Sequence, residues 1–244
     1  MSPRLTLATA VRILRQIAHD PRTIALLLVV PSLLVGLMAW IFEETPVFQQ
    51  VGPAVLGLFP FIVMFLVTSI TTLRERREGT LERLLTMPIG KGDIIGGYTI
   101  AFGLLAVAQS LVAVGYAVWV CGLEVAGDPW LLVLVAVVDS LLGTTLGLFA
   151  SAFAATEFQV VQFMPALVFP QVLLGGIIVP REDMPDVLHA ISDWLPLSHA
   201  IDALDLVSTE ADATGDVLRE LAIVAAFAVV AVVLAAVTLR RRTA

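Results

Sequence analysis

The chain alternates long apolar segments with short polar ones. Six apolar segments reach about 20 residues, the length that an α-helix needs to cross about 30 Å of hydrocarbon at about 1.5 Å per residue. They cover residues 24–42, 51–73, 94–121, 130–153, 160–179 and 221–239. Apolar residues run continuously instead of alternating at every second position, so the pattern excludes the strands of a membrane barrel. We therefore predict an all-α membrane protein with six transmembrane helices.

Residues 1–23 are too polar to span and show helical periodicity. One stripe is apolar (Leu7, Val11, Leu14 and Ala18), and the opposite stripe is polar (Arg12, Arg15, Gln16 and His19). This pattern is typical of an amphipathic helix that lies at the membrane surface. Asp20-Pro21 is expected to end it. The alternative is a solvated basic leader. No cleaved signal peptide is expected, because no short apolar core with a cleavage site is present.

Between the fifth and sixth spans, residues 180–220 are again too polar to cross the membrane. In 180–206, Met184, Leu188, Ile191 and Leu195 recur at helical spacing, and prolines at 180, 185 and 196 separate short elements. We predict outer re-entrant helices that rest on or dip into the outer leaflet, with Trp194 at the interface. Residues 207–219 are expected to form an exposed outer loop.

Charge divides the polar segments into two groups. Only 14 % of the residues are charged and the mean hydropathy is +0.96, which excludes a soluble globule of this size. Twelve of the 14 basic residues lie in 1–23, in 74–93 and in the tail after 239, whereas 14 acidic and two basic residues occupy 43–50, 122–129 and 180–220. The positive-inside rule then places both termini and 74–93 in the cytoplasm. Cys121 is the only cysteine, so an intrachain disulfide is excluded.

Motifs for catalysis or nucleotide binding are missing from the sequence. None of the three histidines forms an H-E-x-x-H motif, and no serine lies in G-x-S-x-G. The only lysine, Lys91, has Leu85 where a phosphate-binding loop needs glycine. We therefore expect no catalytic residue, no metal site and no cofactor bound by this chain.

Asp139 is the one acidic residue well inside a predicted span. An ionised carboxylate in the membrane costs a few kcal/mol or more, so such a residue normally has a partner or a function. One interpretation is a proton carrier; the other is a protonated or hydrogen-bonded structural residue beside Ser140 or Thr144. On the same helix, Gly143 and Gly147 form a GxxxG pair, which indicates a close-packing face.

Polar, aromatic and kinking residues gather in the second and fifth spans. An amphipathic substrate could pass along such a lining, and the candidates for this pathway are Phe59, Phe65, Gln162, Phe163, Phe169 and Gln171. Lipid-facing phenylalanines and prolines that serve helix packing would give the same pattern, so both interpretations stay open.

The densest run of charges, Arg74 to Glu82, begins where the second span ends. Gly79 interrupts it, Thr80 can cap a short helix, and Pro88 closes that helix. Its apolar face would hold Leu81, Leu84 and Leu85. A charge belt that only fixes topology explains the arginines, but it does not explain the interleaved Glu75, Glu78 and Glu82. The mixed charges around a leucine face therefore favour docking of a protein partner.

These residues resemble those of a known family. The run Glu78-Gly79-Thr80-Leu81-Glu82-Arg83-Leu84-Leu85, followed by Thr86-Met87-Pro88, is similar to the E-G-T-L-E-x-L-L-x-T-P segment of permease subunits of the ABC type-2 transporter family. Residues 180–204 resemble the outer segment of that family, closest to the daunorubicin-type drug-efflux permeases. Two positions depart from the pattern: Met87 intervenes before Pro88, and Asp205 stands where arginine is frequent.

The resemblance implies that 1–244 form a single membrane domain in which 78–88 is a coupling helix. Glu78 and Glu82 would make charged contacts with a separate ATPase subunit, Leu81 and Leu85 would be the apolar anchor, and Gly79 would permit the turn. ATP and Mg would be bound by that ATPase. Further partners would be a second permease copy and membrane lipids, and no nucleic acid.

The function implied is export of an amphipathic or apolar drug, antibiotic or lipid across the inner membrane of a bacterium or archaeon. Two alternatives remain from other classes. One is a proton-coupled secondary transporter that uses Asp139, and the other is an intramembrane enzyme with an unfamiliar site.

Overall fold

A computed structural model describes residues 2–43, 45–80 and 90–238, and this part of the chain is helical without strands. Six of its helices are long and apolar enough to cross a membrane, which confirms the six predicted spans. They are α2 (Pro21–Ile41), α3 (Val47–Arg77), α5 (Lys91–Trp119), α6 (Pro129–Ser151), α7 (Glu157–Leu174) and α10 (Thr214–Thr238). The shorter elements are α1 (Pro3–Ala18), η1 (Arg181–Asp183), α8 (Asp186–Ser192) and α9 (Pro196–Thr209).

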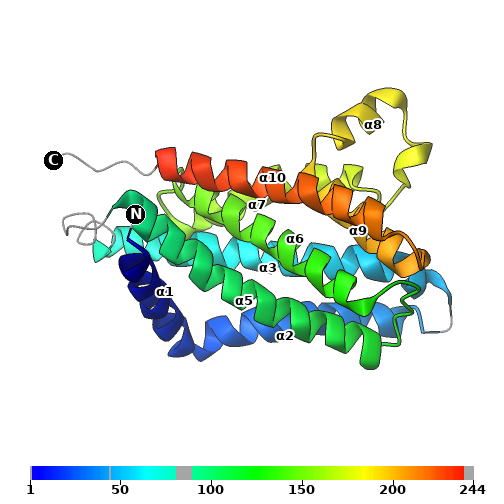
Figure 1. The fold of residues 1–244 in the computed structure, drawn as a ribbon, viewed down its shortest axis with the longest axis horizontal. Helices are drawn as coiled ribbons and strands as arrows, with labels where there is room; N and C mark the ends of the chain where they lie inside the picture. The colour runs from blue at the N-terminus through cyan, green and yellow to red at the C-terminus, as the bar shows by residue number, and fades with distance from the viewer. Residues whose placement is uncertain (1, 44, 81–89, 239–244) are drawn as a thin grey trace.

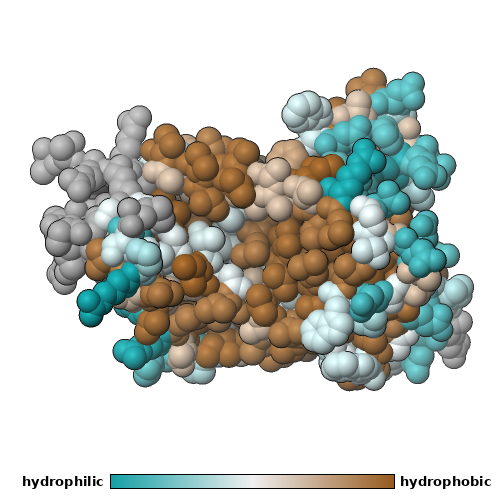
Figure 2. Space-filling model, in the orientation of Figure 1, coloured by the Kyte–Doolittle hydropathy of each residue, from teal (hydrophilic) through white to brown (hydrophobic). Residues whose placement is uncertain are grey.

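The spans run side by side, with α3 and α6 at the centre (Figure 1). In the most apolar window of each helix, 67 % of the α3 residues and 61 % of the α6 residues are buried, against 17 % in α2 and α7 and 22 % in α10. Figure 2 shows the outer surface as a wide apolar band with hydrophilic residues gathered at its ends. Apolar side chains that face outward in this way are suited to lipid or to another membrane chain.

Close packing of α3 on α6 depends on glycine. A Cβ added to Gly143 would lie 2.4 Å from the carbonyl oxygen of Phe61, and one added to Gly147 would lie 2.6 Å from that of Phe65. The predicted GxxxG face is therefore confirmed. Because both partners advance by four residues in the same direction, α3 and α6 are parallel, as alternate spans of a membrane bundle must be.

The prediction of an exposed outer loop at 207–219 is wrong for most of that stretch. Helix α9 continues to Thr209, and α10 already begins at Thr214. Ala213, Val217 and Leu221 recur every fourth residue and are buried, whereas Asp216 and Arg219 are exposed. Asp216 thus lies on the outer face of α10, and Asp212 lies in the exposed turn before that helix.

Exposed tryptophans mark one end of the bundle. Trp40 ends α2, Trp119 ends α5, Trp130 begins α6 and Trp194 follows α8, and each side chain is more than 70 % exposed. These helix ends lie together, at the end that carries α8 and α9 (Figure 1). Tryptophan is favoured at membrane–water interfaces, so this end is suited to an interfacial position.

Helix α1 lies at the opposite end of the bundle and packs on α5 (Figure 1). The predicted apolar stripe is mainly on its outer side, where Leu7 and Val11 are 55 % and 44 % exposed. The face that packs inward holds Thr6, Thr9, Ala10, Ile13 and Ile17. Helix α1 is therefore amphipathic, as predicted, but it has a second buried face that the sequence did not indicate.

Candidate functional site

The last turn of α3 carries the charged run that the sequence singled out, and each of its first three charges contacts another helix. Arg74 binds Glu157 through two contacts, Nε to Oε1 at 2.7 Å and Nη2 to Oε2 at 3.3 Å. Glu157 belongs to the first turn of α7. A carboxylate there is favoured by the partial positive charge of a helix N-terminus, so the ion pair and the helix dipole act together.

Arg76 caps the C-terminal end of α6. Its guanidinium donates to the carbonyl oxygens of Ser151 at 2.5 Å and of Ala152 at 3.1 Å, and also to that of Ala154. The last carbonyls of a helix have no partner within it and carry partial negative charge. A cation at this position therefore satisfies them and fixes the end of α6 to the end of α3.

Glu75 is the buried member of the run, with only 1 % of its side chain exposed. Arg12 of α1 binds it through both guanidinium nitrogens, Nη1 to Oε1 at 3.2 Å and Nη2 to Oε2 at 2.9 Å. The hydroxyl of Tyr98, on α5, donates to Oε2. A buried carboxylate is tolerated when it is paired and hydrogen-bonded in this way. Glu75 thus joins α1, α3 and α5, and our use of it as support for a docking surface was wrong.

Asp93 makes a second junction with α1, at the start of α5. Its Oδ1 accepts from the backbone N–H of Ser2 at 2.6 Å and from the hydroxyl of Thr6 at 3.1 Å, while Oδ2 accepts from the N–H of Gly90 at 3.2 Å. One carboxylate therefore serves the N-termini of two helices. The segment between Glu75 and Asp93 is consequently attached to α1 at both of its ends.

The proposed coupling helix begins between these two junctions. Glu78 is exposed, and Gly79 has φ of 72°, the left-handed region that suits glycine and permits the expected turn. Thr80 is the last described residue here. Leu81, Glu82, Leu84 and Leu85 lie outside the described residues, so their role in docking stays a prediction.

The candidate pathway residues occupy different environments. Phe65 is fully buried, and Gln171 is buried with its side chain bonded to the carbonyl of Leu167 and the N–H of Leu197. Phe59 and Phe163 are partly buried, whereas Gln162 and Phe169 are exposed on α7. The fold does not gather all six on one surface. An exposed subset on α7 remains available to a substrate or a neighbouring chain.

Asp139 is fully buried in α6, and neither carboxyl oxygen has a hydrogen-bond partner among the described residues. The two neighbours that we considered bind elsewhere: Ser140 lies 3.3 Å from the hydroxyl of Ser110, and Thr144 donates to the Ser140 carbonyl. Gly57 of α3 faces Asp139 across the packed interface. The carboxyl group is therefore enclosed between α3 and α6.

For several of these residues, the sequence did not predict the contacts that the structure shows. Arg12 was assigned only to a polar stripe, and Asp93 and Glu157 to no role. Asp93 had a detectable signal, because an acidic residue at the third position of a helix is typical of a capping box. The pairing of Arg12 with Glu75 could not be detected from the sequence, because 63 positions separate the two residues.

Several proteins that are named as permeases are similar to this chain in sequence. The probable multidrug ABC transporter permease YbhR of Escherichia coli K12 is 28 % identical over 152 residues, 62 % of this chain and 41 % of YbhR. The inner membrane transport permease YhhJ of the same strain is 28 % identical over 141 residues, 57 % of this chain and 38 % of YhhJ. The linearmycin resistance permease protein LnrN of Bacillus subtilis is 24 % identical over 160 residues, 66 % of this chain and 41 % of LnrN. The chain thus matches about two fifths of the length of these relatives.

The sequence model of one family, described as ABC-2 type transporter, matches residues 4–207. This stretch runs from α1 into α9 and includes the junctions at Glu75 and Asp93 with the charged segment between them. It covers most of the chain, and the chain therefore belongs to the ABC-2 type transporter family.

Proposed function

We propose that this chain is the membrane-spanning permease of an ATP-driven exporter and that its residues 78–88 dock a separate ATPase subunit. ATP and Mg are bound and hydrolysed by that ATPase, and this chain contributes no catalytic group. A second permease copy completes the assembly. The complex lies in the plasma membrane of a bacterium or archaeon, with both termini and residues 74–93 on the cytoplasmic side.

The observation that carries this proposal is the set of junctions around the end of α3. Arg74, Glu75 and Arg76 join α3 to α7, to α1 with α5, and to α6 respectively. A force applied to the segment that follows would therefore reach four other helices through charge-assisted hydrogen bonds. A charge belt that only sets topology needs arginines near the membrane surface, but it does not need Arg74 and Arg76 to be bonded to two other helices.

The mechanism follows from this attachment. Closure of the ATPase would displace the docking segment, and α1 would move with it because Glu75 and Asp93 hold α1 on both sides. The parallel pair α3 and α6 would follow as one unit, since carbonyl oxygens lie directly against Gly143 and Gly147. Two arrangements of the spans would then be favoured by different nucleotide states of the ATPase.

We propose an apolar or amphipathic substrate, such as a drug, an antibiotic or a lipid. Two relatives are named as a multidrug and a linearmycin resistance permease, which supports export of such compounds. The exposed aromatic and amide side chains of α7, at Gln162 and Phe169, are the part of the candidate pathway most accessible to a substrate.

The alternative, a proton-coupled transporter that uses Asp139, has less support. The carboxyl group is buried between α3 and α6, and no second ionisable side chain contacts it in the described part of the chain. Asp139→Asn in a proton-driven uptake assay tests this alternative, and loss of uptake in the absence of any ATPase would support it.

Co-purification tests the docking proposal. The permease is expressed with the ATPase encoded nearest to it, as wild type and as a Glu82→Arg, Leu85→Asp double variant. We expect wild type to retain the ATPase and the double variant to lose it. Glu182→Arg, at an exposed site in η1, is the matched control and should retain the ATPase. Equal retention by all three, with normal membrane insertion, would contradict the proposal.

A further inference from the structure

A second group of charges lies at the opposite end of the bundle and joins η1, α8, α9 and α10. We call it the outer ionic network, and its members are Arg181, Ser192, Asp193, His199, Asp202 and Glu220. Arg181 is its central cation, with only 12 % of its side chain exposed. It donates from Nε to the hydroxyl of Ser192 at 2.9 Å and forms ion pairs with Asp193 and Asp202. This one side chain therefore fixes the end of α8 to α9.

His199 extends the network to α10. Its ring is nearly buried, with Nδ1 2.5 Å from Glu220 Oε2 and Nε2 3.0 Å from the backbone carbonyl oxygen of Asp193. A neutral imidazole has one N–H donor, whereas an imidazolium has two. The carbonyl oxygen of Asp193 can only accept, so Nε2 of His199 must carry a proton. The contact between Nδ1 and Glu220 then needs a second proton, on Nδ1 or on the carboxyl group. Both contacts therefore form only when the pair holds one proton more than a neutral imidazole and a carboxylate hold together.

Several charged groups lie around His199. Glu220 approaches from α10, Asp193 from the end of α8 and Asp202 from its own helix, and Arg181 is the cation among them. Burial raises the pKa of Asp202, Glu220 acts in the same direction, and Arg181 and His199 oppose it. Three carboxylates against one arginine leave an excess of negative charge in the outer ionic network.

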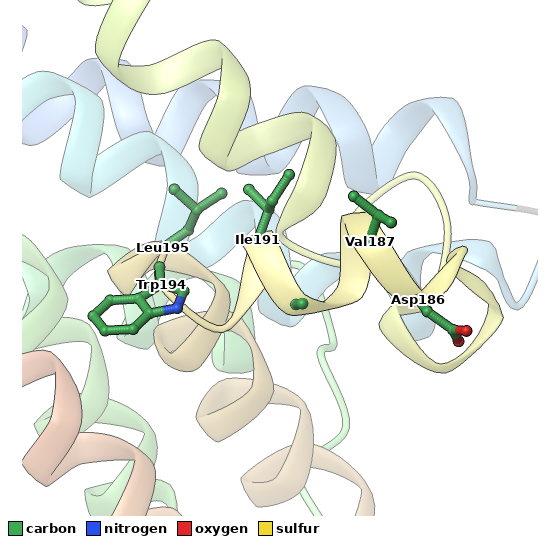
Figure 3. Close-up of a pocket in the computed structure, with 6 residues that line it drawn as sticks. Asp186, Val187, Ile191, Trp194 and Leu195 are labelled. Carbon is green, nitrogen blue, oxygen red and sulfur yellow. The ribbon is translucent and has the colours of Figure 1, made fainter.

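Helix α8 has few other attachments. It packs against α7 and η1, while Val187, Ile191 and Trp194 are 71 %, 45 % and 77 % exposed. Figure 3 shows Val187, Ile191 and Leu195 pointing to one side of the helix, where they line a surface hollow with Asp186 at its end. The polar contacts of the outer ionic network are thus the main connection from α8 to α9 and α10.

We propose that the outer ionic network is a proton-dependent switch. When the His199–Glu220 pair holds the extra proton, both His199 contacts form and the end of α8 is attached to α9 and α10. When that proton leaves, one of the two contacts is lost, Arg181 is left as the main polar attachment of the α8 end, and α8 becomes more mobile relative to α10. A second histidine, His189, lies beside the network, with its Nδ1 3.9 Å from Asp193 Oδ2 at an exposed site. This switch goes beyond the transport proposal and does not depend on it.

The test measures the distance between α8 and α10 in the full-length chain. Cys121→Ser removes the native thiol, and Val187→Cys with Leu218→Cys places a nitroxide on an exposed site of each helix. Pulsed electron resonance then gives the distance distribution in detergent at about pH 5 and at about pH 8, the range in which histidine changes charge. We expect one narrow distribution at the lower pH and a longer, broader one at the higher pH.

Variants assign the effect to His199. His199→Gln should abolish the pH response, because the amide does not titrate, and the matched His189→Gln should keep it. Glu220→Gln retains an acceptor without the charge, so the transition should move to lower pH. If His199→Gln does not fold, this shift in Glu220→Gln tests the role of the His199–Glu220 pair instead. Identical wild-type distributions at both pH values, or a wild-type response in His199→Gln, would overturn the proposal. No ATPase is needed, so the result is independent of the docking test.

Discussion

At the scale of single residues, the meaning of a charge depends on what it contacts. Glu75 and Glu78 are three residues apart in one run, yet Glu75 is buried against Arg12 and Tyr98 while Glu78 is exposed. Only Glu78 is available to a partner chain. The sequence could not separate them, because the difference arises from α1 and α5, which pack around one side of the α3 terminus.

Removal of the buried charge should be costly. Glu75→Gln leaves the Arg12 guanidinium without its carboxylate, and we expect a loss of about 2 to 3 kcal/mol in the free energy of unfolding. This is less than the loss of about 3 to 5 kcal/mol that is usual for a broken buried pair, because the Arg12 side chain is 31 % exposed and water can compensate in part. Unfolding in detergent measures the change. Glu78→Gln is the control and should stay within about 0.5 kcal/mol of wild type; equal losses would show that Glu75 contributes no more than a surface charge.

Asp20 gives a prediction for acid pH. Its side chain caps α2, and hydrogen bonds from the hydroxyl and then the backbone N–H of Thr23 lower its pKa. A depressed folded-state pKa contributes stability that is present above the unfolded pKa and is lost as the pH falls through the folded value. Asp20→Ala should therefore lower the unfolding midpoint at neutral pH. Below about pH 4, the midpoint of the variant should fall less steeply with decreasing pH than the midpoint of wild type. A parallel decline in wild type and variant would contradict this, and Asp212→Ala in an exposed turn is the control.

At the scale of helices, packing is set by small residues as much as by apolar stripes. Helix α1 meets α5 where a Cβ added to Gly97 would lie 2.6 Å from Cβ of Thr9 and 3.0 Å from the carbonyl of Thr6. Hydropathy identified the apolar stripe with Leu7 and Val11, which faces outward, and missed this threonine face. The six spans and the GxxxG pair were predictable because each depends on local composition. The inward face of α1 was not, because it depends on a glycine almost 90 residues away.

The α3–α6 interface should tolerate no added methyl group. In Gly143→Ala the new Cβ would meet the Phe61 carbonyl at 2.4 Å, and backbone cannot move away as a flexible side chain can. We expect a loss of about 1 to 3 kcal/mol in the free energy of unfolding, measured in detergent. Gly215→Ala is the matched control in a helix, because nothing lies within 4 Å of its added Cβ. It should leave stability unchanged or raise it by up to about 1 kcal/mol. The reverse order would contradict the close approach.

At the scale of the whole molecule, the two ends of the bundle are fixed in different ways. At the end with α1, arginines and carboxylates join five helices around the start of the docking segment. At the other end, Arg181 and His199 join η1, α8, α9 and α10, and α8 has an exposed apolar face. The polar segments at each end were predictable from hydropathy, but most of these partnerships were not, because they link residues 11 to 91 positions apart. If the proposals hold, one end receives the action of the ATPase and the other responds to protons.

Attachment of the docking segment to α1 leads to a prediction for the assembled transporter. Asp93→Ala removes the acceptor for Ser2 and Thr6 but leaves Glu82 and Leu85 unchanged. The ATPase should still co-purify, while the response of α1 to nucleotide should be lost. A nitroxide at Leu7→Cys, in a Cys121→Ser chain, reports this response as the change in spin-label mobility between the nucleotide-free complex and the complex trapped with ATP and vanadate.

Two outcomes distinguish a role of Asp93 in moving α1 from a role only in capping helices. If Asp93→Ala retains the ATPase and the Leu7 label no longer responds, the Glu75 junction alone cannot move α1, and both attachments are needed. If the label responds as in wild type, Asp93 only caps helices and the two-point attachment is wrong. A label at Ala211→Cys, in the exposed turn before α10, is the control: its mobility at fixed nucleotide state should be the same with and without Asp93→Ala, because that turn lies at the opposite end of the bundle.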